Sequence, residues 1–346
     1  MKKKLLYSCI IFLLGCSKID SGLLQNQSFE SICSLAYTNN SPFCIVLIDS
    51  TQYLSKEYFL HLQGEYKGLT NKAIYNIIDI NSDENNWYLK WLCPISIPLT
   101  CVFSPDGVLI DLIPGVSKES FLYSEEAIKN METTEFHWPN RFKMNKKKII
   151  PLFNDILELK RDLDIGTDIS SESNLLIDSL RYPYPVYLKL VGELMKQDTI
   201  GAQQTAKSLI ELETPSSLEL YKNEFITAKK ILDPRFDIES EPNIRVDKTT
   251  ISFKDCRINE KTPFNITIYN DGERPLKIEK IHLSCSCLEH LESNKSITID
   301  PKCGYVTKFH FIPDHGGEIL RNIYITSNAI NTPILHIDIS ANVAGN

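Results

Sequence analysis

The spacing of apolar residues changes twice along this chain of 346 residues. Residues 43–48 form an unbroken apolar run, which is typical of a strand buried on both faces of a sheet. From residue 146 apolar residues recur every three or four positions, as they do in amphipathic helices. From residue 262 they alternate with polar residues, as in strands with one buried face. The sequence therefore predicts an α/β domain, an all-α spacer and an all-β domain, in that order.

The α/β domain is expected over residues 29–135. Strand-like runs cover residues 43–48, 73–80, 99–103 and 108–113. Between the first two runs, residues 55–63 have helical spacing, and Ser55 is placed to be the N-cap of that helix. The tetrapeptide Ser104-Pro105-Asp106-Gly107 predicts a type I turn between the last two strands.

This order of elements resembles the thioredoxin fold. Ile97-Pro98 leads into a strand, as the cis-proline of that family does, so the resemblance implies a cis bond at Pro98. In active members a Cys-x-x-Cys pair stands between the first buried strand and its helix, where the helix N-terminus lowers the thiol pKa. The matching positions here read Gln52-Tyr53-Leu54-Ser55. Because neither thiol is present, the resemblance implies a thioredoxin-like domain that has lost its redox chemistry.

The helical spacer is expected over residues 146–233. Ile149, Phe153, Ile156 and Leu163 fall on one helical face. Thr214-Pro215 predicts a helix start, with a capping threonine before a proline at the first helical position. The run Lys146-Lys147-Lys148 is interpreted as a solvated helix start rather than a binding patch.

The all-β domain is expected over residues 244–346, where short alternating strands predict a β-sandwich of immunoglobulin-like size. Several segments resemble a bacterial Ig-like domain family of unknown function that is common in envelope lipoproteins. They are residues 264–272, 276–278, 284–287, 299–304, 311–316 and 325–328. The usual Cys-Gly-Cys-Thr of that family reads Cys285-Ser286-Cys287-Leu288 here. The resemblance implies a fold and a location but no reaction.

The N-terminus predicts where the protein is found. Three lysines are followed by an apolar run over residues 5–14, which leads into the tetrapeptide Leu13-Leu14-Gly15-Cys16. This pattern resembles a bacterial lipoprotein signal with its lipobox. The run is shorter than the ~20 residues that span a bilayer. We therefore expect a signal peptide at residues 1–15, covalent lipid on Cys16 and a tether over residues 16–28. An ordinary cleaved signal with an incidental cysteine is the alternative. Ser17 after the lipidated residue favours the outer membrane, facing the periplasm.

Composition narrows the class of partner. The formal net charge is −7, and loss of the three lysines of the signal changes it to −10. An acidic chain without a basic cluster is a poor ligand for nucleic acid, so none is expected as a partner. The lipid, rather than charge, would attach this protein to the membrane.

Of the ten cysteines, eight remain once Cys9 and Cys16 are set aside. Some of the eight are expected to pair in an oxidising envelope, although eight cysteines allow 105 pairings. On a strand, Cys285 and Cys287 would point to one face, and Cys303 belongs to the same domain. A soft-metal site for zinc or copper(I) at this pair, with His282 and His290 nearby, is weighed against disulfides or buried thiols. Disulfides or buried thiols are favoured, so no metal or other cofactor is expected.

A reactive thiol is the remaining question of chemistry. Cys93 is the best single candidate in the first domain, because it precedes Pro94 and lies close to Pro98 in sequence. No phosphate-binding loop and no hydrolase or metalloprotease motif is present in the sequence. The first hypothesis is therefore a lipid-anchored, non-catalytic protein that binds envelope proteins or peptides. The alternative is a divergent thiol–disulfide oxidoreductase that uses Cys93 or Cys285/Cys287, and soft-metal binding at Cys285/Cys287 is third.

Overall fold

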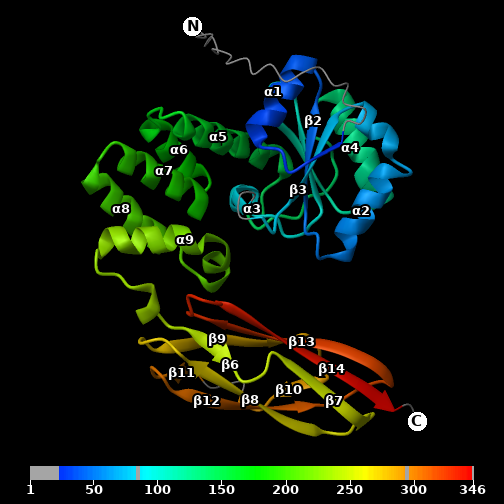
Figure 1. Ribbon diagram of the computed structural model, residues 1–346, viewed down its shortest axis with the longest axis vertical. Helices are drawn as coiled ribbons and strands as arrows, with labels where there is room; N and C mark the ends of the chain where they lie inside the picture. Colours follow the sequence, from blue (N-terminus) through cyan, green and yellow to red (C-terminus); the bar gives the residue numbers. More distant parts are fainter. Residues whose placement is uncertain (1–22, 83–85, 293–295, 345–346) are drawn as a thin grey trace. The chain divides into compact units, whose positions relative to one another are not determined.

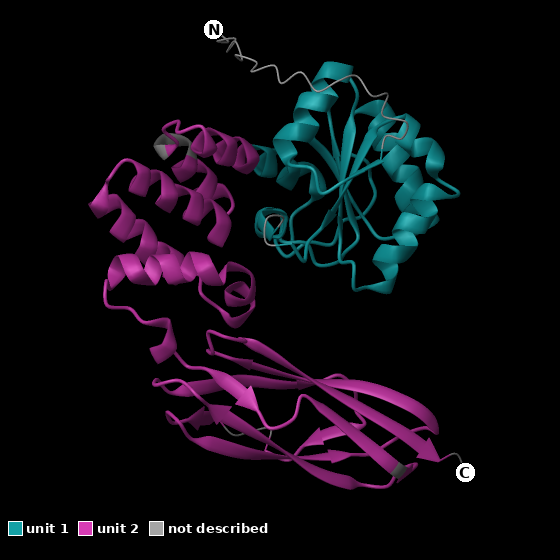
Figure 2. Cartoon of the chain, in the orientation of Figure 1, with its two compact units in different colours: residues 1–154 teal, residues 155–346 magenta. Residues whose placement is uncertain are grey.

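The structure is a computed structural model that describes residues 23–82, 86–292 and 296–344. The chain divides into two compact units, residues 1–154 and residues 155–346 (Figure 2). The content is mixed, with a helical middle and β-sheets toward the C-terminus, as predicted. The lipobox and Cys16 lie outside the described residues.

Unit 1 is built on a five-stranded mixed sheet with strand order β1-β3-β2-β4-β5 (Figure 1). The three strands β1, β3 and β2 are parallel, and β4 and β5 are antiparallel to their neighbours. The bounds are β1 Leu23–Gln25, β2 Phe43–Ile48, β3 Ile74–Asp79, β4 Leu99–Phe103 and β5 Leu109–Pro114. Strand β1 falls in the segment expected to be a tether.

Helices cover both faces of this sheet. Helices α2 and α4 share an apolar core on one face with Cys44, Val46 and Val102. On the other face, Phe29 of α1 contacts the stacked rings of Phe43 and Phe103. The bounds are α1 Phe29–Asn39, α2 Tyr53–Gln63, a 3₁₀ turn Lys67–Asn71, α3 Asn86–Leu92 and α4 Lys118–Asn130. Sheet strands that are buried on both faces agree with the unbroken apolar run over residues 43–48.

Five helices follow, and consecutive helices from α6 to α9 pack against one another. Their bounds are α5 Lys146–Asp164, α6 Ser170–Ser179, α7 Pro183–Met195, α8 Thr199–Ile210 and α9 Pro215–Leu232. The apolar stripe predicted for α5 is confirmed, because Ile149, Phe153 and Ile156 are fully buried. The start of α9 is also confirmed, since Thr214 caps the helix and forms a reciprocal pair with Ser217.

The last part of unit 2 is a sandwich of two sheets around one apolar core. One sheet has the order β10-β12-β8-β6, and the other has the order β11-β9-β13-β14-β7. The strands are β6 Ile244–Val246, β7 Thr250–Arg257, β8 Thr262–Asn270, β9 Leu276–Leu283, β10 Leu288–His290, β11 Ile297–Ile299, β12 Gly304–Phe311, β13 Gly317–Ser327 and β14 Ile334–Ala344. The alternation seen in the sequence is the burial pattern of β8, where Ile266 and Ile268 are in the core and Asn265 is exposed.

Candidate functional site

The loop between β2 and α2 occupies the place where the thioredoxin resemblance sets the redox pair. The Asp49 carboxylate organises this loop by accepting hydrogen bonds from the Thr51 hydroxyl at 2.6 Å, from Gln52 Nε2 at 2.8 Å and from Asn81 Nδ2 at 2.9 Å. These bonds, that from Thr51 above all, lower the pKa of Asp49 to about 2. The loop is thus a hydrogen-bonded turn around an ionised carboxylate, with no thiol in it.

Ser55 does not cap helix α2, so that prediction is wrong. The helix begins at Tyr53 with Gln52 in the N-cap position, and Gln52 makes no side-chain capping bond. Ser55 lies inside the first turn and is buried, and its hydroxyl accepts a hydrogen bond from the Asp49 backbone N–H at 3.0 Å. The serine fastens the end of β2 to the helix instead of capping the helix.

The segment before β4 lies at the same end of the sheet as this loop, where β2 ends and β4 begins. Leu47 of β2 pairs with Leu99 of β4, which brings the end of one strand beside the start of the other. The Ile97–Pro98 bond is cis, and the Pro98 carbonyl accepts a hydrogen bond from Gly115 N–H at 2.9 Å. Pro94 forms an isolated antiparallel bridge with Asn140, which engages the backbone of Ile95. Within the part of the chain that the structure describes, Ser96 and Ile97 make no backbone hydrogen bonds.

Apolar side chains are exposed where these two segments meet the solvent. Tyr53 is 76% exposed, Ile95 53% and Leu54 46%. We call residues 53, 54 and 95–97 the Pro98 edge. It combines apolar side chains with backbone groups that are open to a partner, which is the combination that an added strand uses.

Cys44, Cys93 and Cys101 of unit 1 are buried and do not reach this edge as exposed thiols. Cys93 is 8% exposed, and its sulfur donates to the Lys90 carbonyl at 3.7 Å. Cys44 and Cys101 lie on neighbouring strands, but Cys44 pairs with Val102, so the two thiols point to opposite faces of the sheet. Both are free, and burial raises the pKa of Cys44 to about 12. Thiols held in this way are packing groups rather than nucleophiles.

A cavity of about 480 Å³ lies beside the loop, between helix α2 and the carboxyl ends of the parallel strands. Ile48, Phe59 and Ile77 give it an apolar wall, and Ser55 and Asp79 supply polar groups. The Asp79 carboxylate accepts hydrogen bonds from the Ser50 and Asn81 backbone N–H groups at 3.4 and 3.2 Å. The cavity is therefore lined in part by the β2–α2 loop and by Asp79 at the end of β3.

A buried ion pair in unit 1 was not expected from the sequence. The lysine run predicts a solvated Lys146, but the structure shows it buried. Its side chain is 7% exposed, and its Nζ lies 2.6 Å from Asp111 Oδ1. Thr134 hydrogen-bonds the other Asp111 oxygen at 2.6 Å. Burial lowers the pKa of Lys146, and the neighbouring carboxylate opposes that shift. Lys147, which is paired with Glu135, and Lys148 are both exposed and match the solvated interpretation of this run.

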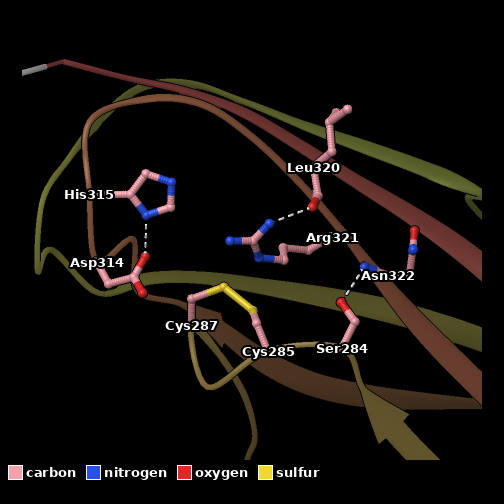
Figure 3. Close-up of a disulfide and its surroundings, with 8 residues drawn as sticks. All are labelled: Ser284, Cys285, Cys287, Asp314, His315, Leu320, Arg321 and Asn322. Carbon is pink, nitrogen blue, oxygen red and sulfur yellow. Dashed lines mark hydrogen bonds and ion pairs between the residues drawn. A yellow bond between two sulfur atoms is a disulfide. The ribbon is translucent and has the colours of Figure 1, made fainter.

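In the sandwich, Cys285 and Cys287 form a disulfide (Figure 3). They lie in the turn between β9 and β10 and not on a strand, so the expectation that a strand directs both side chains to one face is wrong. The disulfide closes a loop of three residues. It therefore restrains the unfolded chain less than a disulfide that closes a 15-residue loop, which stabilises the folded state by about 3 kcal/mol. Cys287 is buried, Cys285 is half-buried and Ser286 between them is exposed.

Cys303, the third candidate cysteine of this domain, is not part of the disulfide. Cys303 is an exposed free thiol in the turn before β12, and its N–H donates to the Asp300 carbonyl at 3.1 Å. His290 does not approach the disulfide as a ligand; its Nε2 lies 2.8 Å from the Thr307 hydroxyl and its ring stacks on Phe309. Among the described residues, no three His, Cys, Asp or Glu side chains are grouped as metal ligands.

No helix among the described residues has the length and apolar character that crossing a membrane requires. This finding concerns residues 23–82, 86–292 and 296–344 alone.

A family model described as "Protein of unknown function (DUF1573)" matches residues 244–343. This confirms the prediction of a C-terminal domain from a family of unknown function. No curated protein matches the chain.

Among solved structures, a protein of unknown function from Porphyromonas gingivalis is 18% identical, with 32% of this chain and 50% of that chain covered and a TM-score of 0.27. The chain thus spans half the length of that protein. A PapD-like domain of human CEP192 is 9% identical, with 32% and 90% covered and a TM-score of 0.25. A C. elegans member of the MSP family is 13% identical, with 29% and 97% covered and a TM-score of 0.22. Scores this low assign no function.

Proposed function

We propose that this chain is a lipid-anchored protein of the bacterial cell envelope that binds extended polypeptide segments without thiol chemistry. The observation that carries the proposal is the Pro98 edge, where Ser96 and Ile97 have open backbone groups beside exposed apolar side chains. An extended segment pairing there would gain backbone hydrogen bonds, and the apolar side chains would be covered.

The thioredoxin-like fold of unit 1 is part of this proposal. The parallel strands β1, β3 and β2, the antiparallel β4 and β5, and helices on both faces support it. At the positions of the lost redox pair, Gln52 binds Asp49 and Ser55 binds the backbone. Neither side chain can attack a disulfide, so the surface would bind a partner and release it unchanged.

We further propose that the sandwich is Ig-like and acts as a second assembly surface. Strand β7 supports this, because it is the outermost strand of its sheet and pairs along one side, with β14. An outermost strand of this length offers unpaired backbone groups to another strand. The lipid on Cys16 would hold both surfaces near the membrane, most directly the outer membrane facing the periplasm.

The test is binding of an unfolded, carboxymethylated polypeptide to the chain, followed by fluorescence anisotropy. Ile95→Asp places a charge in the apolar part of the Pro98 edge and should weaken binding at least about tenfold, since burying an unpaired charge is costly. The matched control is Leu122→Asp, because Leu122 is similarly exposed, at 49%, but lies on α4. Equal affinities for Ile95→Asp and Leu122→Asp, or no binding by the parent chain, would contradict the proposal.

A further inference from the structure

The turn that holds the Cys285–Cys287 disulfide is fixed on both sides by other bonds. Before it, Ser284 N–H donates to the Asn322 carbonyl at 3.0 Å, and the Ser284 hydroxyl accepts from Asn322 N–H at 2.7 Å (Figure 3). After it, Ile312 N–H donates to the Cys287 carbonyl at 2.7 Å, and Leu288 is paired with Phe311. The backbone of the turn is therefore held without the sulfur–sulfur bond.

The two sulfurs also differ in access. Cys287 is 3% exposed and belongs to the apolar core, whereas Cys285 is half-buried at its border. An attacking thiolate can approach Cys285 from solvent, and Cys287 would then be the leaving sulfur. Exchange rates depend on access to the attacked sulfur and on how well the leaving thiolate is stabilised.

A cation stands beside the bond. Figure 3 shows the Arg321 guanidinium next to the disulfide, on the side of His315. The Arg321 side chain is half-buried, and its Nη1 donates to the Leu320 carbonyl at 2.8 Å, which restrains the guanidinium. The Asp314 carboxylate is hydrogen-bonded to His315 Nδ1 at 2.6 Å, and this bond, with a smaller effect of the Arg321 charge, lowers the pKa of Asp314. A fixed cation favours a neighbouring thiolate over the thiol.

From the placement of these groups, we infer that Cys285–Cys287 is a thiol–disulfide exchange site that accepts electrons from a dithiol partner. One partner thiolate attacks Cys285 Sγ, the Cys285–Cys287 bond breaks, and Cys287 leaves as a thiolate beside Arg321. The second partner thiolate then displaces Cys285 from the mixed disulfide. The partner leaves as a disulfide, and its two electrons and two protons are carried by Cys285 and Cys287. The site is independent of the Pro98 edge, because it lies in the other unit.

The test uses the full mature chain with dithiothreitol as the dithiol. After mild treatment, alkylation and mass spectrometry of the peptide that contains Cys285 and Cys287 should show two labels, while circular dichroism stays unchanged. Glutathione, a monothiol, should give a mixed disulfide on Cys285. Labels that appear only after urea unfolds the chain, or loss of the β signal on reduction, would overturn the inference and leave a structural disulfide.

Arg321→Gln separates the role of the cation from the presence of the disulfide. It should slow reduction about threefold, because a change of about one unit in thiol pKa acts on exchange rates with a Brønsted slope near 0.5. Arg245→Gln is the matched control, since Arg245 is an exposed arginine on β6 that pairs with Asp271. Equal rates for the two variants would overturn the assignment of Arg321.

Discussion

At the scale of single residues, the least predictable feature is the ion pair between Lys146 and Asp111. The sequence shows three adjacent lysines, and nothing in that run distinguishes the first from the second. Their environments differ because Asp111, 35 positions earlier, is buried on β5 and needs a counter-charge. Long-range pairing of this kind is decided by the path of the chain, which residue spacing does not encode.

Lys146→Met therefore should destabilise the protein by about 3 kcal/mol, because it leaves the Asp111 carboxylate buried without its cation. The measurement is the free energy of unfolding from urea titration followed by tryptophan fluorescence. The matched control is the neighbouring Lys147→Met, which removes an exposed pair with Glu135 and should leave stability unchanged within error. Equal effects of the two substitutions would show that the buried pair does not matter.

At the scale of elements, the prediction was best where the apolar pattern was longest. The run over residues 43–48 coincides with β2, and the capped start of α9 lies at Thr214-Pro215. The prediction is wrong for one helix start and for one turn. Helix α2 begins at Tyr53, two residues before the predicted cap, and Cys285 and Cys287 lie in a turn instead of a strand. Helix ends depend on one or two hydrogen bonds, here those of Asp49, which no periodicity reveals.

The candidate sites were predicted only in part for the same reason. Sequence comparison with the thioredoxin pattern pointed to Gln52, Ser55 and Pro98, and their segments do leave the sheet at one edge. It could not show that Ser96 and Ile97 have open backbone groups, nor that Cys93 is buried. For the disulfide, spacing identified both cysteines but not Arg321, which arrives from β13, 34 positions after Cys287.

At the scale of the whole molecule, the lipid proposed on Cys16 is expected to attach both compact units to the membrane. Cys16→Ser should move the protein from the membrane fraction to the soluble fraction, since several acyl chains at ~0.8 kcal/mol per buried CH₂ would supply the attachment. Fractionation together with the intact mass of the mature N-terminus checks this. Cys33→Ser is the control, because it replaces a cysteine of α1 and leaves the lipobox intact. A Cys16→Ser protein that remains in the membrane would contradict lipid anchoring.

The central claim is that the Pro98 edge binds extended polypeptide, and hydrogen exchange of the mature chain with and without an unfolded polypeptide tests it most directly. Open backbone amides exchange quickly until a partner pairs with them. We predict slowed exchange at residues 96 and 97 and at the start of α2, and loss of that protection in Ile95→Asp. Protection that appears only along β7 of the sandwich, or nowhere, would contradict the claim.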